Sequence, residues 1–237
     1  MAVDHQHIIT LNVTASGSGY PADLFAPSEL TIAGGKTTVL VGASGTGKST
    51  LLRMLAGLEA VPASFRLDGL NDDLKRAYMT QDVRLLPWLT VERNAGIGNR
   101  LRGEAEDHAG VRETLRKLNL ERDAQKYPSQ ISGGMAQRTA LARTLLERAD
   151  LNLLDEPFAA LDAITRRNMQ DLVKQHFEAK TVVMVTHDPL EAVRLGDAIY
   201  VLSQTEPAGP ATLTPFNGKG AAPGERAEQL FERLQGR

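Results

Sequence analysis

The chain has 237 residues, 42% hydrophobic and 24% charged, which fits a globular protein long enough for one buried α/β domain or two smaller lobes. A formal net charge of −2 provides no overall basic field for nucleic acid or anionic lipid, and the absence of cysteine excludes disulfides, thiolate metal sites and a cysteine nucleophile. The sequence has no secretory signal and no apolar run of the roughly 20 residues that cross a membrane, so we expect any membrane role to require a partner.

A strand, a glycine loop and a helix are predicted in succession near residue 40. The apolar run Thr37–Val41 predicts a buried strand, and Ser49–Leu58 carries leucines at helical spacing. The glycine-rich stretch Gly42–Lys48 joins them. A nearby Gly35-Lys36-Thr37 resembles the end of that stretch, but a strand follows it, so we interpret it as a turn.

Further buried strands alternate with helical stretches, which predicts a mostly parallel, doubly wound sheet. Residues 89–148 are dominated by helical patterns, such as Val111, Leu115 and Leu118, and predict an inserted helical subdomain. The Pro-, Gly- and Thr-rich tail is expected to be loop-like before a short amphipathic helix with Leu230 and Phe231. The predicted strands are Leu151–Leu154, Thr181–Thr186 and Ala198–Leu202, and the predicted divisions are a core of 1–88 and 149–205, the subdomain 89–148 and the tail 206–237.

The glycine loop matches the phosphate-binding pattern G-x-x-x-x-G-K-[ST] in full. Glycines allow backbone N–H groups to converge on phosphate oxygens, Lys48 would reach the β- and γ-phosphates, and the Ser49 hydroxyl would ligate Mg²⁺. An ordinary glycine turn is the alternative, and the flanking strand and helix favour the phosphate loop. The candidate nucleotide-binding residues are Gly42, Ser44, Gly45, Thr46, Gly47, Lys48, Ser49 and Thr50.

Polar residues follow two of the later strands. Asp155 and Glu156 end one strand, where Asp155 would hold Mg²⁺ and Glu156 would polarise an attacking water. His187 follows the next strand and would contact the γ-phosphate. Alone, the acidic pair would suit a helix cap, and the histidine a backbone-bonded strand end. Asp188 and Glu191 are predicted to form the capping box of the following helix.

A second glycine loop, Ile131-Ser-Gly-Gly-Met-Ala-Gln-Arg138, precedes good helix formers. Such a helix N-terminus suits an anion, yet the loop has no lysine of its own.

Together these motifs resemble those of an ATP-binding cassette (ABC) ATPase, and they occur in family order. The parts are the phosphate loop, the Q-loop Gln81, the signature Ile131–Gly134, the acidic Asp155-Glu156-Pro157, the D-loop Ala160-Leu161-Asp162 and the switch His187. The resemblance implies a P-loop NTPase (RecA-like) fold, with a mostly parallel core sheet, an antiparallel β edge region and an inserted helical subdomain. It implies ATP and Mg²⁺ as cofactors, with Gln81 in catalysis and Mg²⁺ binding and Asp162 at the nucleotide.

In this family two cassettes pack head to tail, and each ATP lies between one chain's phosphate loop and the other's signature. The resemblance therefore implies that Ser132, Gly133 and Gly134 hold the γ-phosphate bound to a second copy of the chain, and that hydrolysis releases the dimer.

Two details resemble the cassettes of nitrate, sulfonate and taurine importers: Met135 in place of the usual signature glutamine, and the stretch Leu85–Val91. The resemblance implies integral membrane permease partners, an indirect solute-binding protein, no nucleic acid, and a peripheral location at the cytoplasmic face of the membrane. Trp88 would either dock the permease or pack within the subdomain. Tyr20 is the candidate for stacking on adenine, with Phe25 as the second choice.

Other classes explain less of the sequence. A soluble ABC ATPase acting mechanically on a macromolecule remains the alternative, although such proteins carry two cassettes or a long coiled coil and a basic surface. A P-loop kinase leaves Ser132–Gly134 unexplained, and a GTPase would need a guanine-reading Asn-Lys-x-Asp. A subunit that binds nucleotide but hydrolyses it poorly would not need Gln81, Glu156 and His187 together.

Overall fold

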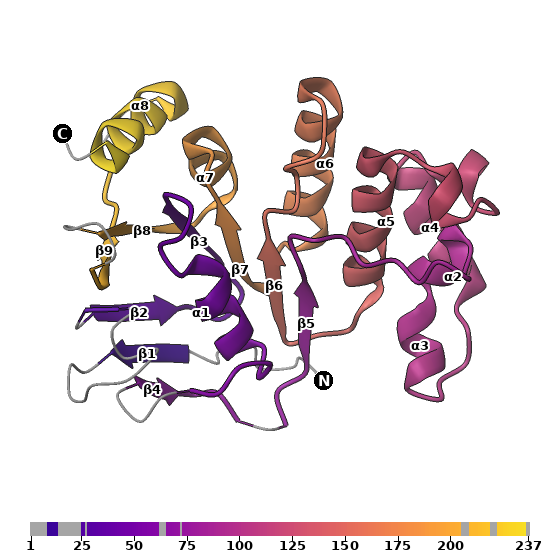
Figure 1. Ribbon diagram of the computed structural model, residues 1–237, viewed down its shortest axis with the longest axis horizontal. Coiled ribbons are helices and arrows are strands. Elements are labelled where there is room, and N and C mark those ends of the chain that lie inside the picture. Colours follow the sequence, from indigo (N-terminus) through magenta and orange to yellow (C-terminus); the bar gives the residue numbers. More distant parts are fainter. Residues whose placement is uncertain are drawn as a thin grey trace. The chain divides into compact units, whose positions relative to one another are not determined.

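The valine-rich runs form neighbouring central strands of a parallel sheet in the computed structural model (Figure 1). Strand β3 (Thr37–Gly42) pairs with β7 (Thr181–Thr186) on one side and β8 (Ala198–Gln204) on the other, and β6 (Leu151–Asp155) pairs with β7, all in parallel. Every residue of β6 and β7 is buried, which is typical of parallel strands covered on both faces.

The structure describes residues 9–13, 25–26, 28–61, 65–71, 73–204, 209–218 and 222–235. The chain divides into two compact units. The first, called here the sheet unit, comprises Met1–Arg76, Asp150–Asp155 and Phe177–Arg237, and the second, the helical unit, comprises Ala77–Ala149 and Glu156–His176.

The sheet unit also contains antiparallel strands. Strands β1 (Ile9–Val13), β2 (Ser28–Ile32) and β4 (Phe65–Asp68) form a separate sheet in the order β2-β1-β4. Strand β9 (Ala211–Pro215) pairs antiparallel with β8. The prediction of a loop-like tail is wrong for these residues. Buried Ala211 and Leu213 alternate with less buried residues, as in a strand, but this pattern is short and the Pro- and Gly-rich composition around it favours a loop.

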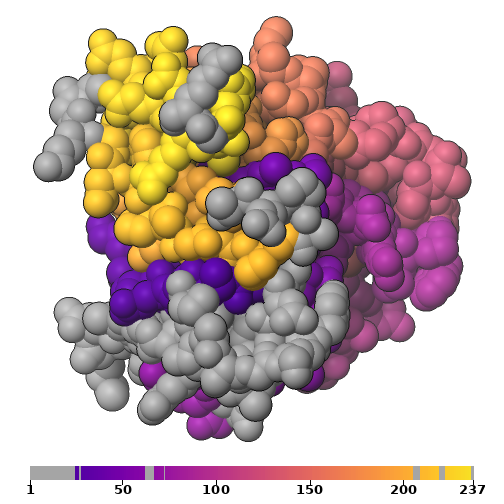
Figure 2. Space-filling view, turned by 60° about the vertical axis from the view of Figure 1, so that its left-hand side comes forward, coloured from indigo at the N-terminus to yellow at the C-terminus, as the bar shows by residue number. Residues whose placement is uncertain are grey.

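The described part of the sheet unit contains three helices: α1 (Lys48–Leu55), α7 (Pro189–Leu195) and α8 (Pro223–Leu234). Helix α1 ends three residues before the predicted Leu58, because Gly57 takes a positive φ of 74° and closes the helix. Leu58 is consequently exposed. The predicted C-terminal amphipathic helix is confirmed as α8, which packs on α7 and is drawn in yellow in Figure 2.

The helical unit begins within β5 (Arg76–Met79) and is built mainly of helices. Val111, Leu115 and Leu118 are buried, as the helical spacing predicted, and the long helix α5 packs against α2 and α4. Its helices are α2 (Val91–Ala95), α3 (Ile97–Leu101), α4 (His108–Lys117), α5 (Gly133–Leu146) and α6 (Ala163–His176), with 3₁₀ turns at Glu121–Asp123 and Pro128–Gln130.

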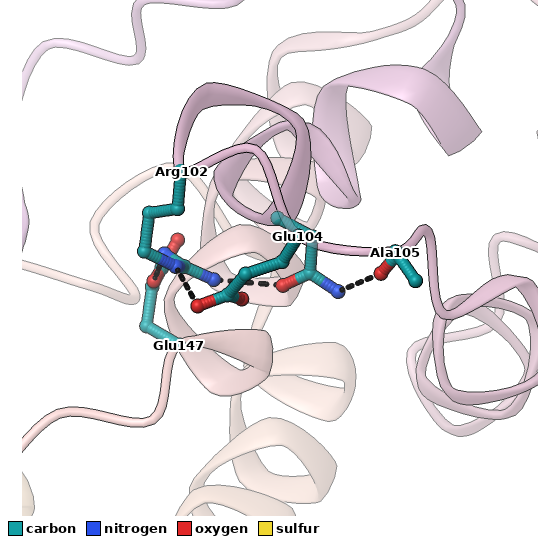
Figure 3. A network of polar contacts seen from close by, with 5 residues as sticks. Arg102, Glu104, Ala105 and Glu147 are labelled. Atoms are coloured by element: carbon teal, nitrogen blue, oxygen red, sulfur yellow. Dashed lines mark hydrogen bonds and ion pairs between the residues drawn. The ribbon is translucent and has the colours of Figure 1, made fainter.

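Polar contacts join the end of α3 to the end of α5 (Figure 3). The Arg102 guanidinium pairs with the carboxylates of Glu104 and Glu147 and donates to Asn99 Oδ1, while Asn99 Nδ2 donates to the Ala105 carbonyl. The two helix ends are thereby fixed within one unit. In the part of the chain that is described, no helix has both the length and the apolarity to cross a membrane.

Candidate functional site

The carboxyl ends of three neighbouring strands bring the predicted phosphate-site residues of the sheet unit to one edge. The register places Val41 of β3 opposite Thr186 of β7, and Asp155 of β6 opposite Val185 of β7. The phosphate loop and His187 follow their strands directly at this edge. Ligands of open parallel sheets bind at this edge, so the fold assembles the candidate site there.

The phosphate loop runs from β3 into α1 as predicted. Ser44 and Gly45 lie exposed at its crest, whereas Lys48 is only 7% exposed and its ammonium donates to the carbonyls of Gly42 at 2.8 Å and Ala43 at 2.6 Å. Thr46 Oγ1 also donates to the Ala43 carbonyl. The positive charge is therefore held inside the loop, under its exposed crest.

Two glycines of the loop are required by geometry. A Cβ on Gly42 would lie 2.5 Å from the Leu202 carbonyl oxygen of the neighbouring strand, so no larger residue fits without a shift. Gly47 precedes α1 with φ 91°, a left-handed conformation that costs other residues energy. The loop motif is thus explained by contacts within the sheet unit as well as by phosphate binding.

The donors available for Mg²⁺ are hard oxygen atoms. Asp155 is almost fully buried at the end of β6, and Ser49 is half-buried in the first turn of α1, which packs against that strand. A hydroxyl and a carboxylate, completed by phosphate oxygens and water, fit Mg²⁺. No group of three or more His, Cys, Asp or Glu side chains able to hold a metal ion occurs among the described residues, so a site made by protein carboxylates alone is not indicated.

The segment after β7 is held by a short relay. The Asp188 N–H donates to Thr186 Oγ1, and the Thr186 hydroxyl donates to the Glu191 carboxylate at 2.6 Å. Asp188 caps α7 as predicted, accepting from the N–H groups of Leu190 and Glu191. The predicted bond from the Asp188 N–H to the Glu191 carboxylate, which would complete the capping box, is wrong. That N–H donates to Thr186 Oγ1 instead. His187 is exposed beside this relay.

In the helical unit, the second glycine loop forms the N-terminus of α5. Ser132 is the N-cap, and its Oγ accepts from the Met135 N–H at 3.3 Å. Ser132 and Gly133 are exposed. The first backbone N–H groups of a helix have no partner within it, so this end is suited to an anion.

Other predicted residues of the helical unit lie on its connecting segments. Gln81 is exposed just after β5. Glu156 is half-buried with a positive φ of 51°. The Asp162 carboxylate accepts from the N–H groups of Ile164 and Thr165 at the start of α6, and these hydrogen bonds, above all the one from Thr165, lower the pKa of Asp162.

Buried polar side chains that sequence reasoning missed support these segments. Gln137 on α5 bonds to the backbone of the segment 156–160, and Asn94 on α2 bonds to the backbone of 86–90. Arg143 on α5 donates to the side chain and carbonyl of Asn94 and to the Arg84 carbonyl. Polar residues on otherwise apolar helix faces are the only sequence signal for them.

Trp88 lies on the surface of the helical unit. Trp88 is 69% exposed, which makes it one of the most exposed large hydrophobic residues in the described part of the chain. It lies on the segment that Asn94 bonds to. Of the two predicted roles for Trp88, packing within the subdomain is therefore wrong. A cavity of about 250 Å³ is lined near this segment by residues that include Leu89, Glu92, Arg93, Ile97 and Arg100.

The candidates for adenine stacking separate clearly. Phe25 is 2% exposed in the core, so the second choice is wrong: a ring without an exposed face offers nothing to stack on. Tyr20 lies outside the described residues.

A strand–phosphate loop–helix unit at the carboxyl edge of a parallel sheet defines the class as a P-loop nucleotide-binding protein. Comparisons then identify the family. The sequence model of the ABC transporter family matches residues 25–159, and the chain belongs to that family.

Similar proteins are named as ATP-binding proteins. Aliphatic sulfonates import ATP-binding protein SsuB of Escherichia coli K12 is 45% identical over 184 residues, 74% of this chain and 70% of the relative. SsuB 2 of Agrobacterium fabrum is 45% identical over 186 residues, 75% and 69% of the two chains. An uncharacterized ABC transporter ATP-binding protein of Haemophilus influenzae is 40% identical over 214 residues, 90% and 89%.

A solved structure of an ATP-binding cassette has the same fold as the chain. The post-hydrolysis dimer of the ATP-binding cassette MJ0796 with ADP and Pi superposes with a TM-score of 0.73 at 29% identity, covering 89% of this chain and 99% of the other. The predicted family, fold class and ATP-binding, ATP-hydrolysing transporter subunit are therefore confirmed.

Proposed function

We propose that the chain is the ATP-hydrolysing subunit of a nutrient importer and acts as a dimer around two ATP molecules. The observation that carries the proposal is the pair of unlike phosphate sites. One chain has a phosphate loop with a buried lysine in its sheet unit and, in its helical unit, an exposed capped helix N-terminus at Ser132 without one. The second site has no lysine of its own, and we propose that the phosphate loop of a second copy supplies one.

The sheet unit is proposed to bind Mg-ATP. Lys48 and the backbone N–H groups of residues 44–50 would bind the phosphates, Ser49, Asp155 and Gln81 would hold Mg²⁺ and its waters, and Tyr20 would stack on adenine. When bound, Mg²⁺ neutralises charge on the phosphates. Glu156 would accept a proton from the attacking water, and His187 and Gln81 would orient the γ-phosphate and that water.

The second copy is proposed to complete each site. Ser132, Gly133 and Gly134 would donate hydrogen bonds to the γ-phosphate on the partner's phosphate loop, with help from the dipole of α5. Asp162 would lie near the same interface. The dimeric MJ0796 cassettes, which are similar in fold, support this arrangement.

A permease is proposed to dock on the helical unit through the exposed Trp88 and the neighbouring cavity. The cavity combines apolar walls with charges of both signs, which suits an amphipathic helix of a membrane subunit. We further propose that the chain acts at the cytoplasmic face of the membrane, that a solute-binding protein supplies the cargo, and that nucleic acid is not a partner. The names of the SsuB relatives favour an organic sulfonate or a similar small nutrient anion as cargo.

The test is hydrolysis by Glu156→Gln. We expect ATP binding to persist while the hydrolysis rate falls by roughly 10²- to 10⁴-fold, the usual contribution of a general base. Glu228→Gln, an exposed carboxylate on α8, is the matched control and should keep the wild-type rate. An unchanged rate in Glu156→Gln would remove this residue from the role of base.

A further inference from the structure

Gln137 is buried on α5. Its side-chain amide nitrogen and oxygen both form hydrogen bonds with the backbone of one segment, residues 156–160. The side chain is 2% exposed. Its Nε2 donates to the Glu156 carbonyl at 2.9 Å, and its Oε1 accepts from the Ala160 N–H at 2.6 Å. A buried neutral amide with donor and acceptor both satisfied on a single loop fixes that loop more firmly than one bond would.

The loop that Gln137 holds begins with an unfavourable backbone conformation. Glu156 has φ 51°, a left-handed conformation that is unfavourable for a residue other than glycine. Such a conformation persists only where its surroundings determine it. The Glu156 carbonyl accepts from Gln137 and also from the Ala159 N–H at 3.2 Å, while Phe158 is buried and anchors the loop by packing.

The same loop lies against the first turn of α5. A Cβ added to Gly134 would be 3.2 Å from the Ala160 carbonyl oxygen, so the helix N-terminus and the loop approach closely. Gln137 stands one turn further along this helix. One helix therefore carries Ser132 at its N-cap and, a few residues later, the amide that holds Glu156.

We propose that Gln137 is a positioning residue for ATP hydrolysis. By bonding to the Glu156 carbonyl it holds that residue in its left-handed conformation, and so sets the direction in which the Glu156 carboxylate points. This inference rests on the proposed role of Glu156 as the base. Because a displacement of about 1 Å at a reacting group can cost up to 10²-fold in rate, loss of the two bonds acts on turnover rather than on ATP binding.

The test is steady-state hydrolysis by the full chain carrying Gln137→Met, which removes both bonds and keeps the side-chain length. We expect kcat to fall by about 10- to 100-fold with the KM for ATP within about twofold of wild type. Gln137→Glu keeps an acceptor for the Ala160 N–H and loses the donor to Glu156, so it carries the same test if the methionine variant does not fold.

Thr139→Val is the matched control. Thr139 is fully buried on the same helix, and its hydroxyl donates to the Met135 carbonyl of that helix. We expect its kcat to stay within about twofold of wild type. An equal loss of kcat in Thr139→Val and Gln137→Met would assign the effect to the packing of α5 and overturn the proposal.

Combination with Glu156→Gln shows whether Gln137 acts through Glu156. If it does, Gln137→Met lowers the residual rate of Glu156→Gln by less than about twofold, because the base is already absent. A full additional loss in a slow Glu156→Gln background overturns the positioning role alone. A normal rate in Glu156→Gln itself overturns the role of the base, and the role of Gln137 with it.

Discussion

At the scale of single residues, the lysine of the phosphate loop shows how a charge is kept ready for a ligand. Its ammonium is almost buried, and the carbonyls of Gly42 and Ala43 accept from it. Burial of a charge without partners would be costly, so these carbonyls hold the lysine in place. In the proposed function, phosphate oxygens would replace the carbonyls as its acceptors.

Lys48→Ala is therefore expected to weaken Mg-ATP binding. A hydrogen bond to a charged group contributes about 1.5–3 kcal/mol, so the Kd should rise by about 10- to 150-fold. Isothermal titration calorimetry on the purified chain measures it. Lys36 in the similar Gly-Lys-Thr turn is the natural control, since its ammonium lies exposed near Asp197. Equal affinity in Lys48→Ala and Lys36→Ala would contradict the assignment of the loop.

At the scale of elements, one buried asparagine organises the segment that carries Trp88. Asn94 is fully buried; its Nδ2 donates to the carbonyls of Leu86, Leu89 and Thr90, and its Oδ1 accepts from the Leu86 N–H at 2.8 Å. Arg143 adds a bond from α5 to the same Oδ1, and burial lowers the pKa of this guanidinium although nearby Glu147 opposes the shift. The exposed Trp88 therefore lies on a segment that several hydrogen bonds to Asn94 hold in place.

Asn94→Leu is expected to release this segment without unfolding the sheet unit. The change leaves the Leu86 N–H and one Arg143 donor, both partly buried, without this acceptor, which costs at most about 1–3 kcal/mol for each unsatisfied group. Hydrogen exchange followed by mass spectrometry should show faster exchange in peptides covering 84–91, with exchange in β3 and β7 unchanged.

Asn99→Leu is the control for this prediction. Asn99 bonds to Arg102 and to the Ala105 carbonyl at the surface of the same unit, where water can replace both partners. We expect little change in exchange at 84–91. If Asn99→Leu and Asn94→Leu accelerate exchange there equally, the buried hydrogen bonds are not what holds the segment.

The contrast between the phosphate loop and these amides explains what the sequence could predict. The loop follows from local rules, because glycine, lysine and a strand–helix context are visible in a window of a few residues. Gln137 bonds to backbone 19 to 23 residues away, and Asn94 accepts from Arg143, which is 49 residues away; nothing local marks which buried polar residue has a distant partner. Strand β9 was missed for a related reason, since its pairing with β8 decides its conformation.

At the scale of the whole molecule, the two proposed phosphate sites lead to a prediction about assembly. Glu156→Gln should hold ATP without hydrolysing it, so two chains should remain joined by two nucleotides. Light scattering should then give twice the monomer mass with Mg-ATP and the monomer mass with Mg-ADP, because ADP lacks the γ-phosphate that Ser132–Gly134 would bind. The Met135 backbone N–H bonds to Ser132 Oγ, so the N-cap of α5 does not depend on a glutamine side chain at position 135.

Ser132→Arg in the Glu156→Gln background should abolish the ATP-dependent dimer. The substitution removes the N-cap of α5 and places a long side chain where the partner's γ-phosphate would lie. Its ATP affinity as a monomer should be unchanged, because its own phosphate loop is intact. Ser129→Arg, three residues away and also exposed, is the matched control and should still dimerise. If Ser132→Arg dimerises as readily as Ser129→Arg, the signature loop does not hold the partner's phosphate. If every variant stays monomeric with both nucleotides, the cassettes associate only on the permease. The same measurement on the assembled transporter then decides the role of Ser132.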